Sequence, residues 1–154
     1  LQNALLEYQR AVVETDRHDA FMSFWRCTEG LSLAGNGEKD EIVNRANWAL
    51  RNTKDESKHI EFIETVSNEM YDARNNWVHE PNWNEMKTSY EYVAKYFCDA
   101  MIQMYIEKLF DKDVQVVKSI FDLSTMEEPQ RENELRNAMH TQNALDGLSS
   151  IESE

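Results

Sequence analysis

Apolar side chains recur along this chain every three to four residues, which is the spacing of one face of an α-helix. Patterns of this kind cover residues 3–15, 16–33, 40–52, 53–79, 85–110, 113–121 and 134–145. The 154 residues include only four glycines and two prolines, so the turn-rich composition of a β-sandwich or barrel is missing. The sequence therefore predicts an all-α fold, a compact antiparallel helical bundle whose longest helix covers residues 85–110.

Polar residues between these patterns predict where individual helices begin and end. Asp16 or His18 should start the second helix, and the run Gly35-Asn36-Gly37 should stop it. Asp40 is expected to cap the third helix. The run Thr53-Lys54-Asp55-Glu56 has the form of a capping box, which predicts the start of the fourth helix.

The length of the chain allows one hydrophobic core but not two ordinary domains. We expect a single helical domain over residues 1–146 and a flexible polar tail over residues 147–154. The first residue is Leu1 rather than Met, which suggests a segment of a longer protein whose other regions could act as partners.

The cysteines and the hydropathy predict a cytoplasmic protein without a membrane segment. Cys27 and Cys98 each lie within an apolar helical pattern, which favours buried thiols over a disulfide or metal ligands. No apolar run approaches the roughly 18 residues of a membrane span, and no basic-then-apolar signal peptide opens the chain.

The balance of charge restricts the partners that the chain can bind. It has 29 acidic residues against 16 lysines and arginines, a formal net charge of −13. Such a surface repels phosphate backbones over most of its area, which disfavours a broad nucleic-acid-binding face. An RNA substrate would have to be held at a small local site, by a partner, or by another region of a longer chain.

The most specific chemical pattern is Arg74-Asn75-Asn76-Trp77-Val78-His79. It closes the fourth helix, which should finish close to His79 because Pro81 disfavours a helical conformation at the preceding residue. A metal-free cleavage of RNA needs a histidine to move protons near neutral pH and an arginine to offset the charge that builds on phosphorus. The structural alternative is that Arg74 pairs with a nearby surface carboxylate and His79 only helps to end the helix.

Two segments resemble the HEPN family of helical domains. The stretch from Met70 to His79 resembles the family signature, in which an amphipathic helix ends in arginine, a polar residue, a few apolar residues and histidine. The segment from Phe21 to Leu31 resembles the family's aromatic helix with a glutamate before a leucine. The resemblance spans roughly residues 21–109 and points to the Apea-like branch, and its specific part is the six-residue motif.

The resemblance implies a HEPN-like bundle that pairs with a second copy and acts as a metal-independent RNA endonuclease in a prokaryotic defence or toxin-like protein. Carried over by position, Arg74, Asn75 and His79 would be the catalytic residues, without a cofactor. Five helical steps place Arg74 and His79 about 140° apart, so they share a cleft only if the helix frays or two copies contribute to it. We therefore expect a homodimer through the motif-bearing helix.

Two other functions are compatible with the sequence. A non-catalytic HEPN-like dimerisation or sensor module would keep the fold and use its acidic surface for protein contacts. An unrelated helical bundle would carry the motif by accident. The intact arginine and histidine favour the nuclease, whereas the net charge of −13 favours the non-catalytic module.

A metal site is the weakest of the remaining candidates. Glu56 and His59 lie one helical turn apart and could bind a metal in a bundle core. A two-metal bundle needs that element twice together with two more inward carboxylates, and the sequence has it once. We expect a solvated helix start here instead.

Two further patterns could assist RNA binding. Trp77 and Trp83 flank His79 and could stack on a base, although packing in a core or dimer is the more common fate of tryptophans at this spacing. Acidic neighbours interrupt a basic series that could otherwise form the rim of a cleft, so a mixed solvated surface is the better expectation. The series consists of Arg45, Arg51, Lys54 and Lys58.

Overall fold

The computed structural model describes residues 1–34, 39–53, 57–79 and 86–152, and its regular elements in these ranges are all helices. The first four are α1 (Gln2–Val13), α2 (Arg17–Ser32), α3 (Lys39–Thr53) and α4 (Ser57–His79). They are followed by α5 (Thr88–Met104), the π-helical η1 (Tyr105–Leu109), α6 (Val114–Thr125) and α7 (Glu128–Glu152). The predicted all-α fold class is confirmed for the described residues.

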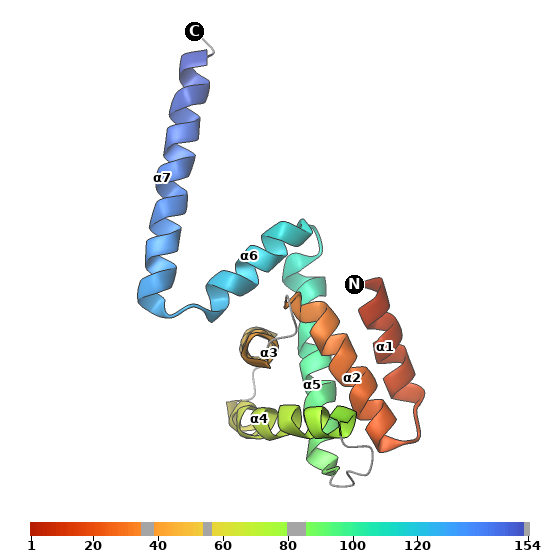
Figure 1. Ribbon diagram of the computed structural model, residues 1–154. Helices are drawn as coiled ribbons and strands as arrows, with labels where there is room; N and C mark the ends of the chain where they lie inside the picture. Colours follow the sequence, from red (N-terminus) through yellow and green to blue (C-terminus); the bar gives the residue numbers. More distant parts are fainter. Residues whose placement is uncertain (35–38, 54–56, 80–85, 153–154) are drawn as a thin grey trace.

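The helices form a bundle in which α2 lies between α1 and α5 (Figure 1). α1 and α2 are antiparallel, whereas α2 and α5 run in the same direction and α4 crosses α5 (Figure 1). The bundle therefore differs from the purely antiparallel arrangement that we predicted. α3 packs against both α5 and α6. α7 follows α6 and points away from the other helices (Figure 1).

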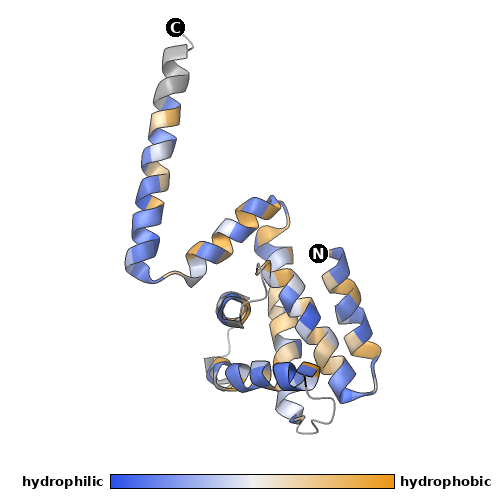
Figure 2. Ribbon diagram, viewed as in Figure 1, coloured by the Kyte–Doolittle hydropathy of each residue, from blue (hydrophilic) through white to orange (hydrophobic). Residues whose placement is uncertain are grey.

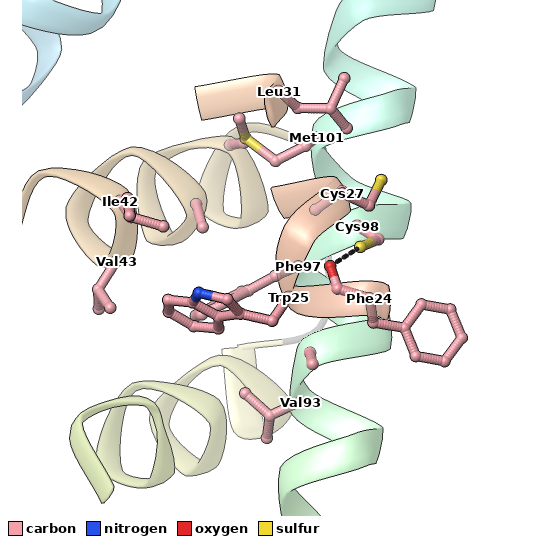
Figure 3. Close-up of a cluster of buried hydrophobic side chains, with 14 of the residues drawn as sticks. Phe24, Trp25, Cys27, Leu31, Ile42, Val43, Val93, Phe97, Cys98 and Met101 are labelled. Atoms are coloured by element: carbon pink, nitrogen blue, oxygen red, sulfur yellow. Dashed lines mark hydrogen bonds between the residues drawn. The ribbon is translucent and has the colours of Figure 1, made fainter. Parts of the chain in front are cut away.

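The core forms where α2, α3 and α5 meet. Figure 3 shows Trp25 of α2 between side chains of α3 and Phe97 of α5. Cys27 and Cys98 are free and buried, as predicted. The Cys98 thiol donates a hydrogen bond to the carbonyl oxygen of Phe24 at 2.8 Å, and burial raises its pKa well above the usual value. A buried thiol of this kind is a packing group rather than a nucleophile.

The start of α2 is capped as the sequence predicts. The Asp16 carboxylate accepts hydrogen bonds from the backbone N–H groups of His18 at 2.9 Å and Asp19 at 3.2 Å. The end of α2 differs, because the helix stops at Ser32 and Leu33 takes the left-handed conformation with φ of 54°. The glycine run that we expected to stop it lies outside the described residues.

The helix starts that we predicted for α3 and α4 need correction. α3 begins at Lys39, so Asp40 lies in its first turn and not at the cap position. Thr53 is the last residue of α3, and its hydroxyl donates to the carbonyl oxygen of Ala49 at 2.8 Å. The rest of the predicted capping box, residues 54–56, lies outside the described residues. α4 ends at His79, where the proline predicted its end.

The predicted helix over residues 85–110 is interrupted near its end. α5 gives way to the wider turn of η1 after Met104. The Tyr105 hydroxyl donates to the carbonyl oxygen of Leu31 at 2.8 Å, which satisfies a backbone group in the last turn of α2. Burial raises the pKa of Tyr105 to about 12, so this donor keeps its proton at neutral pH.

The longest described helix is α7, with 25 residues, although the sequence predicted a helix only over residues 134–145. It extends to Glu152 and so includes most of the segment 147–154 for which we expected a flexible tail. Figure 2 shows apolar residues concentrated along α5, whereas α7 is mainly hydrophilic. Within the described part of the chain, no helix combines the length and apolarity needed to cross a bilayer.

Candidate functional site

Arg74 is anchored across two helices near the end of α4. Its Nη2 donates to Oε1 of Glu29 on α2 at 3.0 Å, and its Nη1 donates to Oδ1 of Asn75 at 2.9 Å. The same Glu29 oxygen accepts the indole N–H of Trp25 at 2.5 Å. Among the described residues, the charged partner that Arg74 contacts is thus a glutamate 45 positions earlier. Glu80, one of the carboxylates close by in sequence that could pair with Arg74, lies outside the described residues.

The anchoring leaves part of the guanidinium accessible. Trp25 is completely buried, which fixes the position of the Glu29 carboxylate. The side chains of Arg74 and Glu29 remain 26% and 27% exposed. A pair at this depth is screened less than a surface pair and can still reach a bound phosphate. Nε of Arg74 is buried without a hydrogen-bond partner among the described residues, so an anion would be met by the remaining N–H bonds of Nη1 and Nη2.

His79 lies at the exposed end of the same helix. α4 is continuous from Arg74 to His79, so the two side chains leave the helix about 140° apart. Asn75 is one turn before His79, and the two positions differ by about 40° around the axis. The structure brings Arg74 and Asn75 together, but a single chain does not place Arg74 and His79 on one face.

The outer side of α4 is mainly polar. Thr65, Glu69, Asp72, Asn76 and His79 are exposed along it. Two large apolar side chains of the helix are also exposed, Phe62 at 47% and Val78 at 48%. An interface between two copies along this helix would bury little apolar surface and would depend on polar contacts.

Trp77 packs against His18, for which the sequence predicted only a place at a helix start. Its ring stacks on His18 at the start of α2, with the ring centroids 4.3 Å apart and the planes at 16°. The His18 Nδ1 lies 3.7 Å from the Asp16 carboxylate, and its Nε2 is buried without a hydrogen-bond partner among the described residues. Only its place at a helix start distinguished His18 in the sequence. Trp83 lies outside the described residues.

Arg45 and Arg51, the members of the basic series whose side chains the structure describes, do not form a rim on the candidate site. Arg45 is buried and donates to the Ser32 carbonyl oxygen at 2.7 Å, to Asp122 at 2.5 Å and to Glu41. Arg51 pairs with Glu64 at 2.7 Å. Lys54 and the side chain of Lys58 lie outside the described residues. The expected mixed surface is present at Arg51, whereas Arg45 is a structural residue.

Metal binding has no support in the described residues. Glu56 and the side chain of His59 lie outside them. In the remainder, no group of three or more His, Cys, Asp or Glu residues could hold a metal ion.

No family model, no curated protein and no solved structure matches this chain. The resemblance to HEPN domains therefore depends on the two sequence segments alone.

Proposed function

We propose that this chain is a metal-independent RNA endonuclease domain of the HEPN type. The observation that carries the proposal is the Arg74 guanidinium, held by Glu29 and Asn75 and still partly exposed, on a helix that ends in an exposed histidine. A fixed cation and a group that accepts and donates protons are the two requirements of RNA transesterification.

In the proposed reaction the ribose 2′-hydroxyl attacks the adjacent phosphorus and loses its proton. The bond from phosphorus to the 5′-oxygen breaks, and that oxygen gains a proton. The products are a 2′,3′-cyclic phosphate and a 5′-hydroxyl. His79 exchanges a proton with one of the two oxygens, and Arg74 stabilises the charge on the phosphorane. Asn75 keeps the guanidinium in place.

The proposed active unit is a homodimer in which α4 of each copy contributes. Because Arg74 and His79 leave one helix on different sides, an Arg74 from one copy and a His79 from the other would complete a cleft. Analytical ultracentrifugation should show a dimer at micromolar concentration. A protein that stays monomeric yet cleaves RNA would contradict the shared site.

The nuclease proposal is tested by incubating the purified protein with mixed single-stranded RNAs and total transfer RNA. Replacing His79 with alanine should lower the rate by on the order of 10²- to 10⁴-fold, as expected for the loss of a general acid or base. The Arg74→Lys variant should also fail to cleave RNA, because a point charge does not reproduce the bidentate contact of a guanidinium with phosphate. Cleavage should persist in EDTA and leave cyclic phosphate ends.

His140→Ala is the matched control, since His140 is also exposed but lies on α7, away from α4. Equal cleavage by the wild type, His79→Ala and Arg74→Ala would identify a contaminating nuclease. Absence of cleavage by every form would remove the nuclease proposal.

A non-catalytic interaction module is the second candidate, and α7 is the observation that favours it. Leu135 and Met139 are exposed one turn apart on this helix, at 47% and 67%. Neighbouring exposed apolar side chains could form part of a surface that contacts another protein. This function predicts an inactive protein that self-associates or binds a partner through α7.

A further inference from the structure

A pocket of about 350 Å³ is lined by residues from the last turn of α4, the end of α1 and the first ten residues of α2. Trp77 and Val78 of α4 line it, together with Met22 and Ser23 of α2. Arg10 of α1 and Arg26 of α2 supply positive charge to it.

The position of this pocket links it to the candidate site. Trp77 and Val78 lie three and four residues after Arg74, so they bracket the face of α4 that carries Arg74, about one helical turn further along. A helical turn rises by about 5.4 Å. A chain that lays one phosphate against Arg74 can therefore place a neighbouring nucleotide in the pocket.

The two arginines of the pocket are both exposed, and they differ in how closely a carboxylate holds them. Their side chains are 69% and 57% exposed, and both lie beside the carboxylate of Glu7. Arg10 bonds one oxygen of Glu7 at 2.7 Å, whereas Arg26 lies 3.9 Å from the other oxygen, beyond hydrogen-bonding distance. That second oxygen has no hydrogen-bond partner among the described residues. The Arg26 guanidinium thus keeps most of its donors for a ligand.

The other residues that line the pocket disfavour a free phosphate relative to a nucleotide. Glu14 and Asp19 also border the pocket, and carboxylates repel an isolated phosphate. One Glu14 oxygen already accepts the backbone N–H groups of Thr15 and Asp16 at 2.7 and 3.0 Å. The apolar surfaces of Met22 and Trp77 can contact a base, which adds an attraction that free phosphate does not have.

We propose that this pocket holds one nucleotide of single-stranded RNA next to the cleaved bond, with its phosphate at Arg10 and Arg26 and its base against Met22 and Trp77. The inference rests on the proposed nuclease function and assigns it a substrate-binding subsite. The two arginines offset Glu14 and Asp19 in the same lining, so the pocket repels RNA less than the strongly acidic chain does as a whole.

The test measures binding separately from cleavage. A fluorescent 2′-O-methyl oligonucleotide lacks the attacking hydroxyl, so its anisotropy reports the Kd of the wild-type protein without turnover. Arg10→Ala and Arg26→Ala should each raise the Kd about tenfold, as expected for one lost charge-assisted contact. Arg51→Ala is the matched control, because Arg51 is 62% exposed and has a carboxylate partner at 2.7 Å, and its Kd should stay within about twofold of wild type.

A nucleoside monophosphate should compete with the oligonucleotide far better than inorganic phosphate, and equal competition would overturn the nucleotide assignment. Wild-type-like binding by the Arg10→Ala/Arg26→Ala double variant, or no binding by the wild type, would overturn the pocket itself. Cleavage of ordinary RNA is measured in the same preparations. Arginine-dependent binding without any cleavage would support the pocket and remove the nuclease. Cleavage together with unchanged binding by the double variant would support the nuclease and overturn the pocket.

Discussion

Arg45 joins three parts of the bundle through one buried guanidinium. It bonds the carbonyl oxygen of Ser32 at the end of α2, Glu41 on its own helix and Asp122 on α6. It also lies over the ring of Phe121, 5.7 Å from the centroid. The guanidinium therefore fixes the position of α6 relative to α2 and α3.

We predict that Arg45→Ala destabilises the protein by about 3–5 kcal/mol, because it leaves two carboxylates and a carbonyl without their shared donor. Urea unfolding gives the free energy of each variant. Arg51→Ala should cost no more than about 1 kcal/mol, as an exposed pair does. Similar losses for the two variants would show that the Arg45 contacts contribute little in solution.

The candidate site was only partly predictable at the level of residues. The pattern around Arg74 identified the arginine and the histidine, because both lie within six positions and carry recognisable chemistry. The most distant partners of Arg74 and Arg45 lie 45 and 77 positions away, and no local pattern marks a contact over such a distance. Arg45 therefore looked like a surface cation, and His18 looked like an ordinary residue of a helix start.

The helical state of most elements was predictable, because a helix with one buried face has an amphipathic pattern in its sequence. α7 is the exception, because every side chain in its described part is exposed or half-buried and no burial imposes a periodic pattern. The break at η1 was also not predictable, because apolar residues continue through it at helical spacing.

We predict that removing residues 128–154 changes the free energy of unfolding of the remaining chain by less than about 1 kcal/mol. α7 contributes no buried side chain in its described part, and isolated helices of moderate length are only marginally stable in water. Amides of α7 should exchange with deuterium much faster than those of α5. As a control, Phe121→Ala on α6 should cost about 3–5 kcal/mol, since that ring is fully buried. A large loss on truncation would mean that α7 docks on the bundle in solution.

At the scale of the whole molecule, the net charge of −13 and the arginines of the candidate site make opposite demands on RNA binding. Long-range repulsion between the protein and RNA is screened as salt rises, over a Debye length of about 10 Å at 0.1 M. Direct contacts between arginine and phosphate weaken over the same range, because binding releases counterions. The measured salt dependence of RNA affinity is the sum of these two effects.

We predict a shallow salt dependence of RNA affinity. Contacts from Arg10, Arg26 and Arg74 would give a slope of log K against log salt of about −2, at about 0.7 per contact for a single strand. Screening of the acidic surface opposes this trend and should bring the slope closer to zero. Anisotropy of the 2′-O-methyl oligonucleotide between about 50 and 200 mM salt measures the slope, with the Arg10→Ala/Arg26→Ala variant as the control that should flatten it further. A slope steeper than about −4 would require an extended basic face, which contradicts binding at a small local site.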